Sequence, residues 1–308
     1  MKRWVSWVLA LAMVTMTLLP ASAEAMPQRA TPETAAVQEL ETQSAEDAIT
    51  GTYGVLTYTV NKDGTSCTIK ACDTAAEGKL EIPEEIDGYK VTGIGYNAFY
   101  DCSSLTSISI PDSVTSIESW AFEDCTSLTS INIPDGVTII DNATFHGCSS
   151  LTSISIPEGV TSIGPNIVSQ GGVKYGAFSG CSSLTSINIP DSVTNIGAYT
   201  FSDCSSLTSI NIPDSVTNIG EYAFSGCSSL TSINIPDGVT SIEYRVFMGC
   251  SLLTNIDIPD SVTSIESCAF EDCSSLTSIS IPDGVTSIGH LAFEDCTSLT
   301  SINIPDGV

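Results

Sequence analysis

The chain has 308 residues, of which 36 are acidic and 9 are basic, so its formal net charge at neutral pH is −27. After Lys90 the only basic residues are Lys174 and Arg245. Almost no cations are present to neutralise phosphates, so we expect neither a nucleic-acid partner nor direct membrane binding once an export signal is removed.

Residues 1–25 have the pattern of a signal peptide. Lys2 and Arg3 form a basic start, residues 8–19 are apolar but too short to span a membrane comfortably, and residues 21–23 match an A-x-A cleavage site. An uncleaved anchor is the alternative. The pattern predicts that the mature chain is secreted or exposed on the cell surface, and the export signal looks bacterial.

Two segments precede the main body of the chain. Residues 26–50 are rich in Ala, Thr, Glu, Gln and Pro without an apolar period, which predicts a flexible linker. Residues 51–79 contain two alternating stretches around Asp63-Gly64, a strong signal for a β-hairpin. Cys67 and Cys72 lie in this segment, and for them we keep open both a disulfide and free thiols.

Residues 80–308 consist of copies of one motif. A cysteine marks each copy, at intervals of 23 residues except for one interval of 33, which contains a ten-residue insertion near residues 165–174: Cys102, Cys125, Cys148, Cys181, Cys204, Cys227, Cys250, Cys273 and Cys296. A period of this length indicates a solenoid or an array. One copy cannot bury enough apolar surface to fold alone, so neighbouring copies must share their apolar faces. The hairpin of residues 51–79 is therefore predicted to cap the first copy.

The segment Cys204–Phe224 shows the motif clearly. It contains L-x-x-I-x-I, the strand signature of leucine-rich repeats, and Pro213 ends the strand because it has no amide hydrogen to donate. The returning segment carries apolar residues and ends in Tyr-Ala-Phe. We predict a leucine-rich-repeat solenoid with a parallel β-sheet on one face and short turns or single helical turns on the other.

The consensus C-x-x-L-x-x-I-x-I-P-x-x-V-x-x-I-G-x-x-A-F resembles the BspA-type leucine-rich repeats of bacterial surface proteins. The hairpin followed by IPEEIDGYKVTGIGYNAF is also similar to the start of such arrays, so the resemblance covers about residues 54–308. It implies extracellular display and adhesion to a protein or glycan, and it carries over no catalytic residue. The sequence stops at Val308 within a copy, which predicts a truncated array whose open edge promotes end-to-end self-association.

The regularity of the repeat argues against catalysis. His146 and His290 occupy different columns of the repeat, and no nucleophile, phosphate-binding or H-E-x-x-H motif is present. We expect no enzymatic activity, no cofactor and no metal. The nine cysteines are predicted to form a buried ladder of free thiols, because nine equivalent positions cannot all pair. Cys268 lies outside this ladder and is predicted to be an exposed, reactive thiol.

A second column is acidic. Its members follow the proline of each copy, and we expect them to cap backbone N–H groups in their own turns, with calcium held between copies as the alternative: Asp112, Asp135, Glu158, Asp191, Asp214, Asp237, Asp260, Asp283 and Asp306.

Two surfaces are candidates for ligand binding. The strand face repeats small polar residues, beginning with Thr106, Ser107 and Ser109, and suits a repetitive ligand such as a glycan bound through many weak contacts. The other candidate is the column two residues before each phenylalanine, where the copies differ. Tyrosine and arginine are favoured anchors at interfaces, so we predict that a protein ligand binds this column and its neighbours: Trp120, Lys174, Tyr175, Tyr199, Tyr222, Tyr244 and Arg245.

The sequence therefore predicts a secreted or cell-surface protein that binds protein or glycan ligands. The alternative is a structural spacer or display scaffold for a domain beyond residue 308. A third reading places a catalytic domain there.

Overall fold

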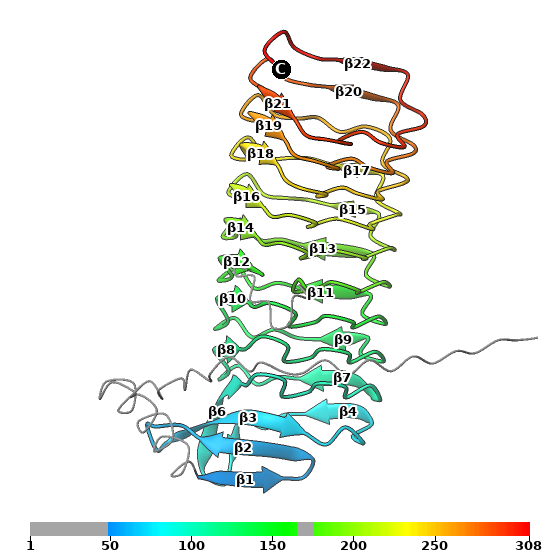
Figure 1. Ribbon diagram of the computed structural model, residues 1–308. Coiled ribbons are helices and arrows are strands. Elements are labelled where there is room, and N and C mark those ends of the chain that lie inside the picture. The colour runs from blue at the N-terminus through cyan, green and yellow to red at the C-terminus, as the bar shows by residue number, and fades with distance from the viewer. Residues whose placement is uncertain (1–48, 165–174) are drawn as a thin grey trace, which may run out of the picture. The chain divides into compact units, whose positions relative to one another are not determined.

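The computed structural model describes residues 49–164 and 175–308, which belong to one compact unit. The predicted signal peptide, the linker up to residue 48 and the insertion at residues 165–174 lie outside the described residues. Within the described ranges the chain winds through stacked turns, as in a solenoid (Figure 1). No helix is present in these ranges, so the arc opposite the predicted sheet contains turns but no single helical turns. The same ranges hold no helix long and apolar enough to cross a membrane.

An antiparallel β-hairpin begins the unit, as predicted, and joins the array through a parallel strand. Strands β2 and β3 form the hairpin, β1 adds a third strand that the sequence did not indicate, and β3 pairs in parallel with β6. The short β5 pairs with β6, and β8 continues from β6 into the array. The bounds are Thr50–Tyr53 (β1), Leu56–Val60 (β2), Ser66–Cys72 (β3), Glu85–Ile86 (β5), Tyr89–Ile94 (β6) and Ser116–Ile117 (β8).

The first column of parallel strands is formed by the segment that carries the leucine-rich signature. Equivalent residues lie opposite one another in it, as in the pairs Ile108–Ile131 and Ile154–Ile187. In the copy that follows Cys250, only isolated bridges at Asp257 continue the column. Its strands are β4 (Gly78–Glu81), β7 (Leu105–Ser109), β9 (Ser130–Ile131), β11 (Ser153–Ser155), β13 (Ser186–Asn188), β15 (Ser209–Ile210), β17 (Ser232–Ile233), β20 (Ser278–Ser280) and β22 (Ser301–Asn303).

A second column of parallel strands runs along the returning arc, where the sequence predicted only turns. Each strand has two residues, and its isoleucine points into the core except at β21, where the isoleucine is half-buried. The column continues from β8 through β10 (Ile139–Ile140), β12 (Ser162–Ile163), β14 (Asn195–Ile196), β16 (Asn218–Ile219), β18 (Ser241–Ile242), β19 (Ser264–Ile265) and β21 (Ser287–Ile288).

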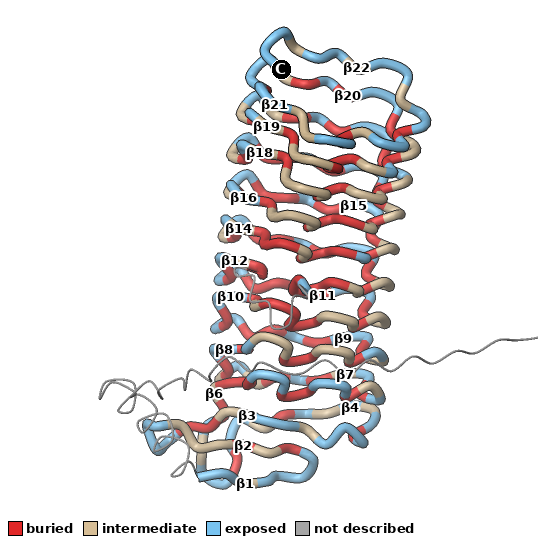
Figure 2. The backbone as a smooth tube through the Cα atoms, in the orientation of Figure 1, coloured by how far each residue is buried: buried red, intermediate tan, exposed pale blue. Residues whose placement is uncertain are grey.

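A stack of phenylalanine rings runs through the core between the strand columns and the turns. Neighbouring rings are nearly parallel, with centroids 5.1–5.7 Å apart. All but the last ring are fully buried: Phe99, Phe122, Phe145, Phe178, Phe201, Phe224, Phe247, Phe270 and Phe293. Figure 2 shows buried residues in red in successive turns of the array, except in the last turn around β22, which is largely exposed.

The nine cysteines of the repeat form the predicted buried ladder of free thiols. From Cys125 onward, each thiol donates a hydrogen bond to the carbonyl oxygen of the phenylalanine one turn earlier, at 3.1–3.3 Å between sulfur and oxygen. Burial raises the pKa of these thiols, to about 12 at Cys125 and Cys181. The thiols from Cys125 onward are therefore protonated and unreactive at neutral pH.

The expectation that Cys268 is exposed is wrong, and of the two alternatives left open for Cys67 and Cys72 the structure favours free thiols. Cys268 is only 5% exposed, because its turn packs against the next one and its thiol points to the carbonyl of His290. Cys67 and Cys72 are free, and they lie near opposite ends of the same strand, β3. Five residues of strand span about 16 Å, whereas a disulfide needs Cα atoms about 4.4–6.8 Å apart.

The acidic column lies on the surface. All nine residues are exposed, and none of their carboxylates accepts a hydrogen bond from a backbone N–H group. The expectation that they cap their turns is therefore wrong. The turn is closed instead by the backbone, for example from the amide of Val216 to the carbonyl of Pro213 at 3.0 Å. Within residues 49–164 and 175–308, no three potential metal-ligating side chains come together.

Replacing one ring of the phenylalanine stack should destabilise the array strongly. We expect Phe224→Ala to lower the free energy of unfolding by about 3–5 kcal/mol, because it removes a fully buried ring and leaves a cavity. Urea unfolding followed by circular dichroism measures the loss. Phe224→Leu should lose less, and Ser232→Ala, on the exposed strand face, should lose almost nothing. Equal losses for all three would contradict a role for the stack.

The thiols should differ in reactivity as they differ in burial. In the reduced, folded chain we expect Cys72, which is half-buried, to react quickly with a small thiol reagent. The other eleven cysteines are buried and should react only after denaturation. Time-resolved thiol titration counts the two classes. Rapid modification of several ladder cysteines in the folded chain would show that the ladder is open.

Candidate ligand-binding surface

The variable column lies on the turn that carries the phenylalanine of each copy. Each turn is closed by a backbone hydrogen bond, from Ser202 to Tyr199 at 3.0 Å and from Met248 to Arg245 at 3.2 Å. Successive turns are tied together by further backbone bonds, such as that from Tyr222 to the carbonyl of Tyr244 at 3.0 Å. Equivalent side chains are therefore presented at regular intervals along the array.

Every described member of the column except Gly176 has left-handed backbone geometry. The φ angles are 51–65° at Asn97, Trp120, Ala143, Tyr199, Tyr222, Arg245, Cys268 and Leu291. For residues with a Cβ atom this conformation costs about 1–2 kcal/mol relative to the right-handed one. This constraint could not be predicted from the sequence, because glycine and asparagine, the residues best suited to it, are almost absent from the column.

A second left-handed column, directly before each cysteine, provides an internal comparison. It contains only aspartate and glycine, all with positive φ: Asp101, Asp124, Gly147, Gly180, Asp203, Gly226, Gly249, Asp272 and Asp295. Backbone tolerance explains the choice of residues there. It does not explain tryptophan, tyrosine and arginine in the variable column, so their presence must have its reason in the side chains.

Four of the seven residues predicted to bind a ligand form one cluster, which we call the tyrosine–arginine surface: Tyr199, Tyr222, Tyr244 and Arg245. The rings of Tyr199 and Tyr222 stack at 4.5 Å, and Tyr244 meets Tyr222 edge-on at 5.3 Å. All four side chains are half-buried. Burial, followed by the neighbouring Tyr222 and Glu221, raises the pKa of Tyr199 to about 12.

The guanidinium of Arg245 is fixed from several sides. Its central carbon lies 5.1 Å from the ring centroid of Tyr244 and 5.8 Å from that of Tyr222. It donates a hydrogen bond of 3.3 Å to the Tyr222 hydroxyl. Contacts with the side chain of Cys268 and then with Tyr222 raise the pKa of Arg245 above its usual value, so the group stays charged.

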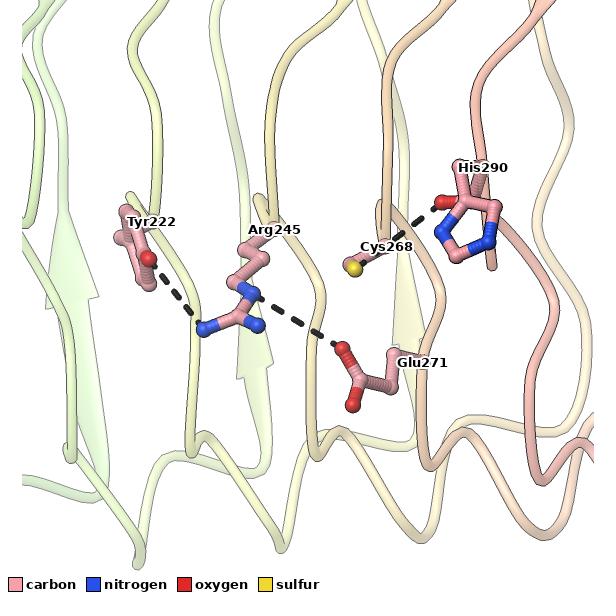
Figure 3. Close-up of polar contacts among 5 residues, drawn as sticks. All are labelled: Tyr222, Arg245, Cys268, Glu271 and His290. Carbon is pink, nitrogen blue, oxygen red and sulfur yellow. Dashed lines mark hydrogen bonds and ion pairs between the residues drawn. The ribbon is translucent and has the colours of Figure 1, made fainter.

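Glu271 is a member of this site that the sequence did not indicate. Figure 3 shows Arg245 lying between the Tyr222 hydroxyl and the Glu271 carboxylate. The Arg245 Nε and Glu271 Oε2 atoms are 3.7 Å apart, close enough for an ion pair but too far for a hydrogen bond, and both atoms are buried. Glu271 belongs to the column after the phenylalanine, and the closed turn brings that column beside the variable one. The sequence did not single out Glu271, because glutamate and serine each occur three times among the nine members of that column.

The other predicted residues lie apart from this cluster. Tyr175 stacks on His146 at 4.0 Å and meets Trp120 edge-on at 5.7 Å, so its ring contacts earlier copies. Gly176 has no left-handed φ, and a Cβ atom added to it would overlap the backbone of Tyr199. The turn at the insertion therefore differs from the others. Lys174 lies outside the described residues.

The strand face has its own geometry. Threonine hydroxyls there donate to the threonine carbonyl of the preceding copy at 3.0–3.4 Å, which occupies part of their hydrogen-bonding capacity. A shallow depression of about 550 Å³ lies over β4, β7 and β9, lined by Lys79, Leu80, Glu81, Ser107, Ile108, Ser109, Ser130, Ile131 and Asn132.

Comparison with protein families identifies the repeat. Residues 79–175, 169–276 and 240–308 match the model of the BspA type leucine rich repeat region. The chain belongs to this family of bacterial surface proteins. The resemblance seen in the repeat consensus is thereby confirmed. The comparison with curated proteins gave no match.

Solved structures of bacterial leucine-rich repeat proteins are also similar to this BspA-type chain. A leucine-rich repeat protein from Bacteroides ovatus is 30% identical, with 83% of this chain and 82% of that chain covered and a TM-score of 0.41. A leucine rich cell surface protein from Faecalibacterium prausnitzii is 28% identical, covering 84% and 96%, with a TM-score of 0.36. The leucine rich repeat protein of T. pallidum is 27% identical, covering 82% and 91%, with a TM-score of 0.47.

The raised pKa of Tyr199 should be measurable. Because folding favours its neutral form, the contribution of this residue to stability is present below pH of about 10 and is lost as the pH rises toward about 12. The ultraviolet phenolate titration of the wild type minus that of Tyr199→Phe should therefore show one tyrosine that ionises near pH 12. Circular dichroism of both proteins controls for unfolding. A difference curve centred near pH 10 would contradict the packing described for Tyr199.

Proposed function

We propose that this chain is a non-enzymatic adhesion protein of the bacterial cell surface that binds a protein ligand through the tyrosine–arginine surface. The observation that carries the proposal is the contrast between the two left-handed columns. One holds only aspartate and glycine, whereas five of the nine members of the other are large residues at the same unfavourable backbone angle, namely Trp120, Tyr199, Tyr222, Arg245 and Leu291. Strained residues with large side chains on a surface are typical of binding sites.

The surface has the physical properties of an interface anchor. Tyrosine and arginine dominate the binding energy of many protein interfaces. Here their side chains already pack against one another, so binding loses less side-chain freedom than it would with mobile residues. The rest of the chain is strongly acidic. That charge favours a ligand with basic residues around an apolar or aromatic contact.

Export and surface display are part of the proposal. The basic start, the short apolar run and the A-x-A site of residues 1–25 support secretion. Membership of a family of bacterial surface proteins supports display outside the cell. The regular solenoid supports a scaffold rather than an enzyme. Binding by Trp120, Lys174 and Tyr175, and end-to-end self-association, stay predictions.

A glycan bound to the strand face is the second candidate. The depression over β4, β7 and β9 favours it, because exposed serine side chains there can pair with hydroxyl groups. The array repeats these groups at a constant spacing, so a repetitive glycan would gain affinity through many weak contacts.

The proposal is tested with a triple variant. An array of extracellular-matrix proteins and glycans, probed with the purified chain, identifies ligands. For a protein ligand, we expect Tyr199→Ala/Tyr222→Ala/Arg245→Ala to weaken binding at least tenfold, or by about 1.4 kcal/mol or more. Surface plasmon resonance measures the affinity, and circular dichroism confirms that the variant remains folded.

A matched control changes the strand face of neighbouring copies. Thr208→Ala/Thr231→Ala/Thr254→Ala removes three exposed hydroxyl groups and should leave the affinity for the protein ligand unchanged. The opposite result, with full binding by the first variant and weak binding by the second, would assign the ligand to the strand face. If no ligand binds the wild-type chain at all, the spacer alternative is favoured.

A further inference from the structure

Two cysteines meet where the N-terminal hairpin joins the array. Cys72 ends β3, and its backbone amide donates to the carbonyl of Ala98 at 2.7 Å, which places it beside the turn that leads to Cys102. Both thiols point to the carbonyl oxygen of Asp73, Cys72 at 3.6 Å and Cys102 at 4.0 Å. Both sulfur atoms are therefore in contact with one carbonyl oxygen. No other pair of thiols among the described residues has such a contact.

Cys102 is the first rung of the thiol ladder and lacks the partner that the others have. Every later rung donates to a phenylalanine carbonyl at 3.1–3.3 Å. No phenylalanine precedes Cys102 by one turn, because the hairpin segment takes the place of a copy there. The contact between the Cys102 sulfur and the Asp73 carbonyl oxygen is longer, at 4.0 Å, so this thiol lacks a close hydrogen-bond acceptor. The sulfur of Cys72 is its neighbour.

We propose that Cys72 and Cys102 form a disulfide that fastens the hairpin to the first repeat once the chain is in an oxidising environment. The bond closes residues 72–102, the segment from the end of β3 to the turn that precedes β7. Such a crosslink restricts the unfolded chain and holds the hairpin over the first repeat. The proposal does not depend on ligand binding. Its occurrence in the cell needs export, because disulfides persist mainly outside the cytoplasm.

The chemistry proceeds by thiol–disulfide exchange with a small disulfide such as oxidised glutathione, or with the disulfide of an extracytoplasmic oxidoreductase. The Cys72 thiol loses its proton, and its thiolate attacks one sulfur of the oxidant, which releases the other as a thiolate. The deprotonated sulfur of Cys102 then attacks the Cys72 sulfur of this mixed disulfide and releases the second thiolate. Two protein thiols are oxidised, and one disulfide is reduced to two thiols.

The environment of the pair supports this order of steps. Cys72 is half-buried and accessible to an oxidant, whereas Cys102 is fully buried. Contact with the side chain of Cys102 lowers the pKa of Cys72, and the same contact, followed by burial, raises that of Cys102. Cys72 is therefore the attacking thiol. Cys67 is too far away along β3, and Cys125 is held by the Phe99 carbonyl.

The test uses the reduced full chain incubated with a mixture of oxidised and reduced glutathione. We expect two of the twelve thiols to disappear and the mass to fall by two hydrogen atoms. Cleavage after lysine and glutamate separates the relevant cysteines. Cys72 lies in residues 71–77, Cys102 in residues 91–118 and Cys125 in residues 124–158. Mass spectrometry without reduction should find the first two peptides joined.

The variant Cys72→Ser should retain all eleven of its thiols under the same conditions. Oxidation should raise the midpoint of thermal unfolding of the wild type and leave that of Cys72→Ser unchanged, with Cys67→Ala as the matched cysteine variant that still forms the bond. Retention of all twelve thiols by the folded wild type would overturn the proposal. Linkage of Cys102 to Cys125, or loss of two thiols in Cys72→Ser, would overturn it as well.

Discussion

The whole structure depends on the stacking of equivalent residues in register. A single copy has too little apolar surface to fold, so each ring of the phenylalanine stack, each thiol of the ladder and each isoleucine of the strand columns needs its counterpart in the next copy. The rings stack at 5.1–5.7 Å while the thiols bond to the phenylalanine carbonyls at 3.1–3.3 Å. These contacts share one register, because a copy shifted by one residue would turn its isoleucines outward and its serines inward.

This constraint divides each copy into positions that carry the fold and positions that remain open to function. The column before each cysteine belongs to the fold, since its left-handed backbone admits only aspartate or glycine in this chain. The variable column, two residues before each phenylalanine, has the same backbone angle except at Gly176, and yet several of its members are tyrosine, tryptophan or arginine. All copies share one fold, so the fold does not account for differences in residue type at equivalent positions. Those differences belong to the surface.

The period and the strand signature were enough to predict the solenoid, the first strand column and the buried thiols, and the alternating stretches around Asp63-Gly64 predicted the hairpin. The second strand column was missed because each of its strands has only two residues, too few to show an alternating pattern. Cys268 was expected to be exposed because its column varies, but contacts from adjacent turns bury it. The position of Tyr175 could not be predicted, since the insertion changes its turn and directs its ring toward His146. The contact between Glu271 and Arg245 could not be predicted, because the closed turn places their two columns side by side only in the folded chain.

The places where the register begins or is interrupted are where the chemistry departs from the repeat. Next to the insertion, the ring of Tyr175 lies apart from the tyrosine–arginine surface and packs on Trp120 and His146. At the hairpin, the first thiol of the ladder lacks a phenylalanine carbonyl and meets a second thiol instead. The repeat itself offers no hydrogen-bond acceptor to the first thiol of the ladder, because no earlier copy exists to supply a phenylalanine carbonyl. The hairpin must therefore supply both backbone partners and a side-chain partner, and Cys72 is placed where that side-chain partner is needed.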